Sequence, residues 1–218
     1  MTGGERGLWL GPQSPQAQRE DLATFTDRAR RLDDAAVIRL RQRGEDVLVA
    51  WVATGFDVLA SRVLAGRVRP ADLCVGADAL SAGMAAMTPD GYVDPGFSMD
   101  SAWRGALPPD SGFVHLDDIP ADVVHELAQR GTQLAREHAG PHGPPTSLLD
   151  QDVVHVSSAA DTVGVPMRCV LALTGMGFVP VGRDREVVRV RVTPTWLRVD
   201  ARFGTVYRRR GDPALVLR

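Results

Sequence analysis

Apolar and polar positions in the first half of the chain follow two different periods, which predict helices beside a small sheet. Apolar residues recur at helical spacing from about Gln16 to Leu32 and again from Pro70 to Met87. Between these stretches, residues 35–44 and 45–54 are β-rich runs separated by a polar turn that contains glycine, which is typical of a hairpin. Residues 56–68 are compatible with a strand or a helix, and we expect a third strand.

Residues 88–112 interrupt this periodicity and predict a long loop. The stretch is rich in Pro, Gly and Asp, yet it also carries Tyr92, Phe97 and Trp103, and aromatic side chains at this density argue against full disorder. Loops of this length in compact domains are usually functional or disordered. The functional interpretation is a lid over a ligand pocket, whereas the interpretation that we favour is a connector between domains.

The predicted domain organisation follows from these patterns. Residues 1–15 are rich in Gly, Pro and Gln, and we expect them to form a flexible arm. Residues 16–87 form an α+β domain with a small antiparallel sheet, and the loop 88–112 joins it to residues 113–218. The two larger parts could also pack together as one domain.

Residues 156–194 carry the most distinctive pattern of the chain. Ala160 is small where two helices would cross closely, and Gly164 follows where a turn needs a left-handed backbone. The apolar residues around them have the spacing of two packed helices, and a basic β-ribbon comes next. This stretch resembles the winged helix-turn-helix module, which implies a helix, a tight turn, a second helix and a two-stranded wing.

The resemblance implies that the second helix would lie in a DNA groove, but its side chains suit that role poorly. The positions that would face the bases are Pro166, Met167, Arg168, Leu171 and Ala172. Only Arg168 among them can bond to a base edge or a phosphate. We therefore expect Met167 and Leu171 to dock a protein partner or a second copy of the chain.

Basic residues gather after this helix and indicate nucleic acid as an alternative partner. Residues 166–218 hold eleven arginines and four acidic residues, a net charge of +7, whereas residues 1–165 have a net charge of −9. A basic cluster can neutralise phosphates without reading sequence. The candidate contacts are Arg168, Arg183, Arg185, Arg189, Arg191, Arg208, Arg209 and Arg210.

Composition indicates a globular protein without a membrane span. Hydrophobic residues make up 44% and charged residues 24% of the 218 residues, and charges interrupt every apolar run before the roughly 18 residues that a span requires. The chain has no Lys or Asn, which indicates a high-GC bacterial genome. Cys74 and Cys169 lie in apolar patterns without metal-ligand spacing, so we expect two free thiols and a cytoplasmic location.

No local motif identifies a catalytic chemistry. The chain has neither the nucleophile elbow of serine hydrolases nor a phosphate-binding glycine loop of the common patterns. Glu137, His138 and His142 are close in sequence, but the intervening Ala-Gly-Pro would break a helix that aligned them, so we expect no metal and no cofactor. An enzyme is the less favoured interpretation.

The sequence thus predicts an α+β fold. The N-terminal part is a small antiparallel sheet with helices, and the C-terminal part is a winged-helix-like unit with a basic β-ribbon. The predicted function is that of a non-catalytic cytoplasmic adaptor or regulatory protein that acts through protein–protein contact. The first alternative is a DNA- or RNA-associated protein that binds phosphates through its arginines. The second is an enzyme or ligand binder with the 88–112 loop as its lid.

Overall fold

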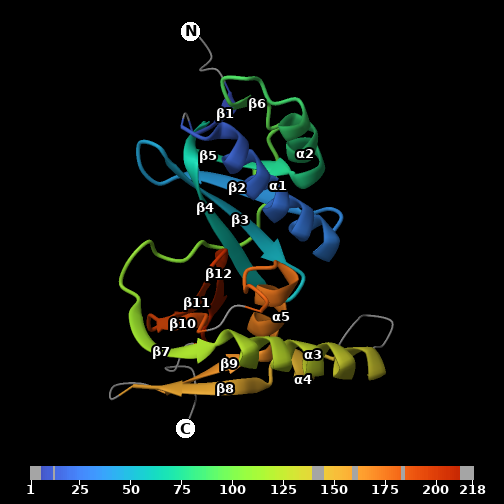
Figure 1. Cartoon of the computed structure of the whole chain (residues 1–218), viewed down its shortest axis with the longest axis vertical. Coiled ribbons are helices and arrows are strands. Elements are labelled where there is room, and N and C mark those ends of the chain that lie inside the picture. The colour runs from blue at the N-terminus through green and yellow to red at the C-terminus, as the bar shows by residue number, and fades with distance from the viewer. Residues whose placement is uncertain (1–5, 12, 139–144, 159–161, 183–184, 212–218) are drawn as a thin grey trace. The chain divides into compact units, whose positions relative to one another are not determined.

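The computed structural model describes residues 6–11, 13–138, 145–158, 162–182 and 185–211. The chain divides into two compact units, each with its own helices and strands (Figure 1). Unit 1 comprises Met1–Gly55 and Ser61–Ala106, and unit 2 comprises Phe56–Ala60 and Leu107–Arg218. Among the described residues, no helix is both long and apolar enough to cross a membrane.

Unit 1 is a mostly antiparallel sheet with two packed helices. Its elements are β1 (Gly7–Leu10), α1 (Pro15–Leu32), β2 (Val37–Gln42), β3 (Val47–Thr54), β4 (Val58–Arg69, which begins in unit 2), β5 (Asp72–Gly76), α2 (Ala77–Ala85), β6 (Tyr92–Val93) and the 3-10 turn η1 (Asp100–Ala102). The strand order is β5-β2-β3-β4, and β1 pairs antiparallel with β4 and with β6. The helices α1 and α2 pack against each other, as Figure 1 shows.

The two sequence periods explain the core of unit 1. Leu22, Phe25 and Ala29 follow each other at helical spacing, so they lie on one face of α1, and all three are buried. Ile38 and Leu40 alternate with arginines in β2, so both point to one face of the sheet, and both are buried. The helix stripe and the strand face therefore supply the apolar surfaces that hold unit 1 together.

Unit 2 also contains a sheet and a pair of packed helices. Its elements are β7 (Val114–Pro120), α3 (Ala121–Glu137), α4 (Thr146–Leu149), β8 (Asp152–Ser157), β9 (Thr162–Pro166), α5 (Met167–Gly175), β10 (Val187–Val192), β11 (Trp196–Ala201) and β12 (Gly204–Arg209). The strands β12-β11-β10-β7 are neighbours in that order and pair antiparallel, while β8 and β9 form a separate hairpin. The helices α3 and α5 pack together closely enough that a Cβ on Gly131 would meet the side chain of Met167.

The basic ribbon of the sequence begins with β10, an inner strand of the unit 2 sheet between β11 and β7. Val188, Val190 and Val192 alternate with arginines in β10, and all three valines are buried. Arg189 and Arg191 consequently point to the opposite face of the sheet. The strands β11 and β12 follow it and form an antiparallel hairpin.

The helix-turn-helix prediction at 156–173 is wrong. Its first half is the hairpin of β8 and β9, and only its second half is a helix, α5. Val154 and Val156 in β8 and Val163 and Val165 in β9 recur every second residue, which is the period of a strand, and valine is a favoured strand residue. Gly164 therefore lies inside β9 opposite His155, not in a turn between helices.

The predicted wing is wrong in its first strand, because residues 178–182 are not part of a strand. The predicted helix at 70–87 is correct only from Ala77, since Asp72–Gly76 form β5. Leu73, Cys74 and Val75 are a short apolar run, and periodicity cannot distinguish a buried strand from a helix over so few residues. The predicted helix near 16–32, the hairpin of β2 and β3, and the third strand β4 are confirmed.

Candidate protein-interaction site

The helix α5 is part of the core of unit 2. Met167 is only 3% exposed and Leu171 only 8%, and every residue from Met167 to Leu173 is buried. The two side chains that the sequence nominated for docking a partner therefore pack inside the unit. The helix is apolar because it is enclosed, and not because it presents an apolar surface.

Arg168, the residue nominated to contact a base, is the buried centre of an ionic cluster in unit 2. Its Nε and Nη2 donate to Asp150 Oδ1 at 3.1 and 2.6 Å, and its Nη1 donates to the carbonyl oxygen of Phe56 at 2.6 Å. Arg208 Nη2 donates to the same Asp150 oxygen at 2.9 Å. Hydrogen bonds of this kind satisfy a buried guanidinium, so Arg168 and Arg208 have structural roles.

Acidic residues neutralise much of the remaining arginine ribbon. Asp200 forms ion pairs with Arg191 and with Arg198, and Glu186 lies 3.5 Å from Arg202. Arg210 donates to the carbonyl oxygen of Thr193. The surface charge of this region is therefore smaller than the count of arginines suggests.

Three of the nominated arginines are exposed. Arg185 follows the turn before β10, Arg189 lies in β10, and Arg209 lies in β12 with its guanidinium 5.8 Å from the centre of the Trp196 ring. The cross-strand register places Arg189 and Arg209 on the same face of the sheet. Arg183 lies outside the described residues.

The aromatic residues of the 88–112 loop lie in unit 1 and are spread apart. Tyr92 belongs to β6 and packs against Trp9, with ring centres 5.4 Å apart. Trp103 lies beneath the guanidinium of Arg39, 5.5 Å from its carbon. Phe97 is 88% exposed. The loop is thus fixed on the surface of unit 1 by separate contacts.

The exposed side of α3 offers a different candidate site. A hollow of about 820 Å³ lies between α3 and the end of α5. It is lined by His125, Ala128, Gln129, Thr132, Gln133, Arg136, Glu137, Thr174 and Gly175. A second hollow of about 290 Å³ lies between α3 and α4 and is lined by Leu134, His138, Pro145, Ser147, Leu148 and Gln151. We call these two hollows and the helix between them the α3 surface.

The chemistry of the α3 surface is amide, hydroxyl and apolar. Leu134 is 41% exposed, so an aliphatic side chain stands at the edge of the smaller hollow. Among the charged residues of α3, Arg130 pairs with Glu126 and Glu137 accepts a hydrogen bond from Gln133, while Arg136 and Glu137 both line the larger hollow. Ligand pockets commonly combine an apolar lining with a few polar groups that orient the ligand, and this surface has both.

The histidines and cysteines have structural surroundings. His125 bonds to the carbonyl oxygen of Pro180 at 3.0 Å, and His115 to Asp118 at 2.8 Å. No cluster of three or more metal-ligating side chains is found within the described ranges. Burial raises the pKa of the Cys74 thiol to about 11 and that of Cys169 to about 12, so neither is an activated nucleophile.

Sequence reasoning missed the α3 surface for a definite reason. Leu134 shares a helical stripe with Val124 and Gly131, which are buried, so spacing alone assigns it to the core. The stripe leaves the core toward the C-terminal end of α3, because α4 meets the helix there with a gap. No local signal in the sequence separates Leu134 from the buried residues of the stripe.

Family models divide the chain at the same place as the fold. Residues 5–105 match the family described as domain of unknown function DUF8010, and residues 108–213 match domain of unknown function DUF8185. No curated protein matches the chain.

Solved structures with the same fold are bacterial DNA polymerase sliding clamps. A Eubacterium rectale protein described as a DNA polymerase III beta subunit has a TM-score of 0.60 and 12% identity, over 95% of this chain and 65% of its own. The Caulobacter crescentus sliding clamp has a TM-score of 0.56 and 14% identity, over 98% of this chain and 69% of its own. The Streptococcus pyogenes beta subunit has a TM-score of 0.53 and 9% identity, over 97% and 67%.

These matches assign the fold. The chain spans about two thirds of the length of the sliding clamps and has a mixed α and β architecture like theirs. This likeness extends over nearly the whole chain, so it replaces the winged helix-turn-helix interpretation of residues 156–194.

Proposed function

We propose that this protein is a non-catalytic cytoplasmic scaffold that binds a short segment of another protein at the α3 surface. The observation that carries the proposal is the exposed Leu134 at the edge of a hollow that Pro145 and Leu148 also line with apolar groups, beside the polar side chains of Ser147 and Gln151. An apolar side chain of the partner would fill this hollow, and its backbone would bond to amide and hydroxyl groups such as those of Gln151 and Ser147. The clamp-like fold and the two buried free cysteines support the scaffold and its reducing compartment.

Charge favours a protein segment over a nucleic acid at this surface. The helix α3 holds Asp122, Glu126 and Glu137 against Arg130 and Arg136, a net charge of −1. A phosphate backbone needs a positive surface, so it would gain little here. A neutral peptide with an apolar anchor would meet no such penalty.

The proposal is tested with random twelve-residue peptides displayed on phage and selected on the whole protein. We expect the enriched peptides to share an apolar anchor and to bind Leu134→Asp at least tenfold more weakly, measured by fluorescence polarisation. Val123→Asp is the matched control, since Val123 is also an exposed aliphatic residue of α3 but lines neither hollow. Peptides that bind Leu134→Asp as tightly as the unaltered protein contradict the proposal.

A second candidate function is association with DNA or RNA through the exposed arginines of unit 2. It is supported by Arg189 and Arg209, which lie on one face of the sheet. With Arg185, the exposed nominated arginines within the described ranges would neutralise about three phosphates, so the slope of log K against log salt should be about −3. A gel-shift assay at low salt measures this binding, and Arg189→Ser with Arg209→Ser should abolish it while leaving peptide binding intact.

A further inference from the structure

The strand β5 is the edge strand of the unit 1 sheet, and its outward backbone groups are covered by a loop instead of a strand. Its neighbour in the sheet is β2. The Cys74 N–H donates to Asp100 Oδ1 at 2.8 Å, and the Cys74 carbonyl accepts from the Met99 N–H at 2.7 Å. Residues 98–102, which we call the edge guard, thus occupy the two bonds that an added strand would make.

Polar contacts hold the edge guard in place. Ser98 Oγ donates to Asp100 Oδ2 at 2.6 Å, which orients the carboxylate toward β5. This bond and the one from the Cys74 N–H lower the pKa of Asp100, so the carboxylate is the bound form. Phe97 and Met99 are exposed, so the guard is not anchored by burying them. The edge guard can therefore be displaced without opening the core.

The edge beneath the guard is complementary to itself. Cys74 directs both a donor and an acceptor outward, so two copies related by a twofold axis through this residue would exchange two hydrogen bonds in an antiparallel pair. In that register Leu73 faces Val75 of the other copy, which places apolar side chains together. Asp72 faces Gly76, so the two aspartates are not opposed.

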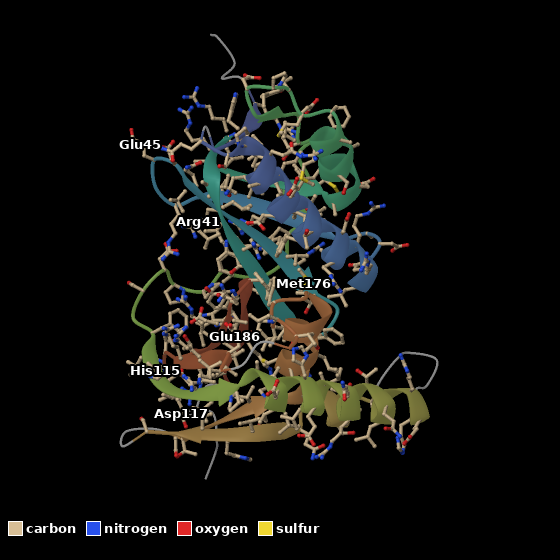
Figure 2. All side chains as sticks on the ribbon, viewed as in Figure 1. Arg41, Glu45, His115, Asp117, Met176 and Glu186 are labelled. Carbon is tan, nitrogen blue, oxygen red and sulfur yellow. The ribbon has the colours of Figure 1, made fainter. Side chains whose placement is uncertain are left out.

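The strand β7, at an edge of the unit 2 sheet, is poorly suited to accept a strand. Its register with β10 shifts between Val190 and Arg191, which marks a bulge. Asp117 Oδ1 accepts a hydrogen bond from the Asp118 N–H at 2.8 Å. The strand β7 also carries the polar side chain of His115. His115 and Asp117 are labelled on this strand in Figure 2. Charged side chains and bulges of this kind protect edges from pairing.

We propose that β5 is a self-association edge for a second copy of this chain, and that residues 98–102 keep it closed. The surface lies in unit 1 and is separate from the α3 surface of unit 2. Displacement of the guard would let two β5 strands pair around Cys74.

The test combines two substitutions that remove both guard bonds. Met99→Pro removes the N–H donor, and Asp100→Ala removes the acceptor. Light scattering after gel filtration should show a monomer for the unaltered protein and a dimer for the double variant. The matched control is Asp100→Asn, which retains an oxygen acceptor for the Cys74 N–H and should remain monomeric.

Cys74 reports the register of the dimer. Opposed residues of a hydrogen-bonded antiparallel pair have Cα atoms about 5.5 Å apart, which lies within the range that a disulfide spans. Mild oxidation should raise the fraction of disulfide-linked dimer at least tenfold in the double variant, and Cys74→Ser should remove it. Cys169 is fully buried and should not contribute.

Two outcomes would overturn the proposal. The first is a folded double variant, judged by circular dichroism, that stays monomeric and forms no cross-link. The second applies if the double variant does not fold. Ser98→Ala then replaces it, because this substitution removes only the hydrogen bond that orients Asp100. A rate of Cys74 cross-linking in Ser98→Ala no higher than in the unaltered protein contradicts the proposal. In the first outcome, a dimer that retains Cys74 but forms no Cys74–Cys74 cross-link on oxidation counts equally against the β5 register.

Discussion

The helices α5 and α3 of unit 2 pack against each other but use their side chains in opposite ways. From Met167 to Leu173 α5 is buried, and its one charged residue, Arg168, is paired inside the unit. By contrast, α3 buries only a stripe that includes Val124, Ala128 and Gly131, and the rest of its surface is exposed. A helix that is apolar all round belongs to the core, whereas an amphipathic helix retains a surface that a partner can reach.

The strongest test of this comparison places the same charge on each helix. Met167→Asp should lower the free energy of unfolding by about 3 to 5 kcal/mol, because it buries an unpaired carboxylate. Val123→Asp on α3 should change it by less than about 0.5 kcal/mol, as expected for an exposed position. Urea denaturation followed by circular dichroism measures both values, and equal losses would contradict the contrast between the helices.

A second test removes the acid that neutralises the buried arginine of α5. Asp150→Ala leaves Arg168 without its carboxylate and should cost about 2 to 3 kcal/mol, somewhat less than a fully buried partner, because the Asp150 side chain is 44% exposed. Asp57 lies 3.7 Å from the same guanidinium but is almost fully exposed, so Asp57→Asn should cost less than about 0.5 kcal/mol. Equal effects of the two substitutions in the same denaturation assay would show that Asp150 has no special role.

A third test concerns the Cys169 thiol of α5, whose effect appears only at alkaline pH. Burial raises its pKa to about 12, so the folded state keeps the proton that the unfolded chain releases near pH 8.5. Its contribution to stability is therefore complete below about pH 8.5 and is lost as the pH rises toward 12. Melting temperatures between pH 7 and 11 should fall less steeply for Cys169→Ala than for the unaltered protein, and identical slopes would contradict this prediction.

Secondary structure was predictable wherever the pattern was long. The helix α1 and the hairpin of β2 and β3 follow from periods that extend over many residues. The hairpin of β8 and β9 was mistaken for a helix because a small residue and a glycine happened to fall at helix-turn-helix spacing, although the valines around them alternate. Local spacing over so few residues does not decide between the two structures.

The candidate sites were less predictable because exposure depends on neighbours that are distant in the sequence. Met167 and Leu171 have the composition of a docking surface, and only the packing of α3 against α5 shows that they are buried. The arginine ribbon has a high formal charge, yet Asp150, Glu186 and Asp200 reach it through the fold. Leu134 has the spacing of a core residue and is nevertheless exposed.

The sequence by itself determined the mixed α and β composition, the helix α1 and the hairpin of β2 and β3, because hydrophobic periodicity is a local property of the chain. Only the tertiary structure decided which apolar helix is enclosed, which arginines are neutralised and which strand edge is covered by residues 98–102. These features depend on which side chains meet across the fold. Arg168 and Asp150 are 18 residues apart and Cys74 and Asp100 are 26 apart, so no local pattern records these contacts.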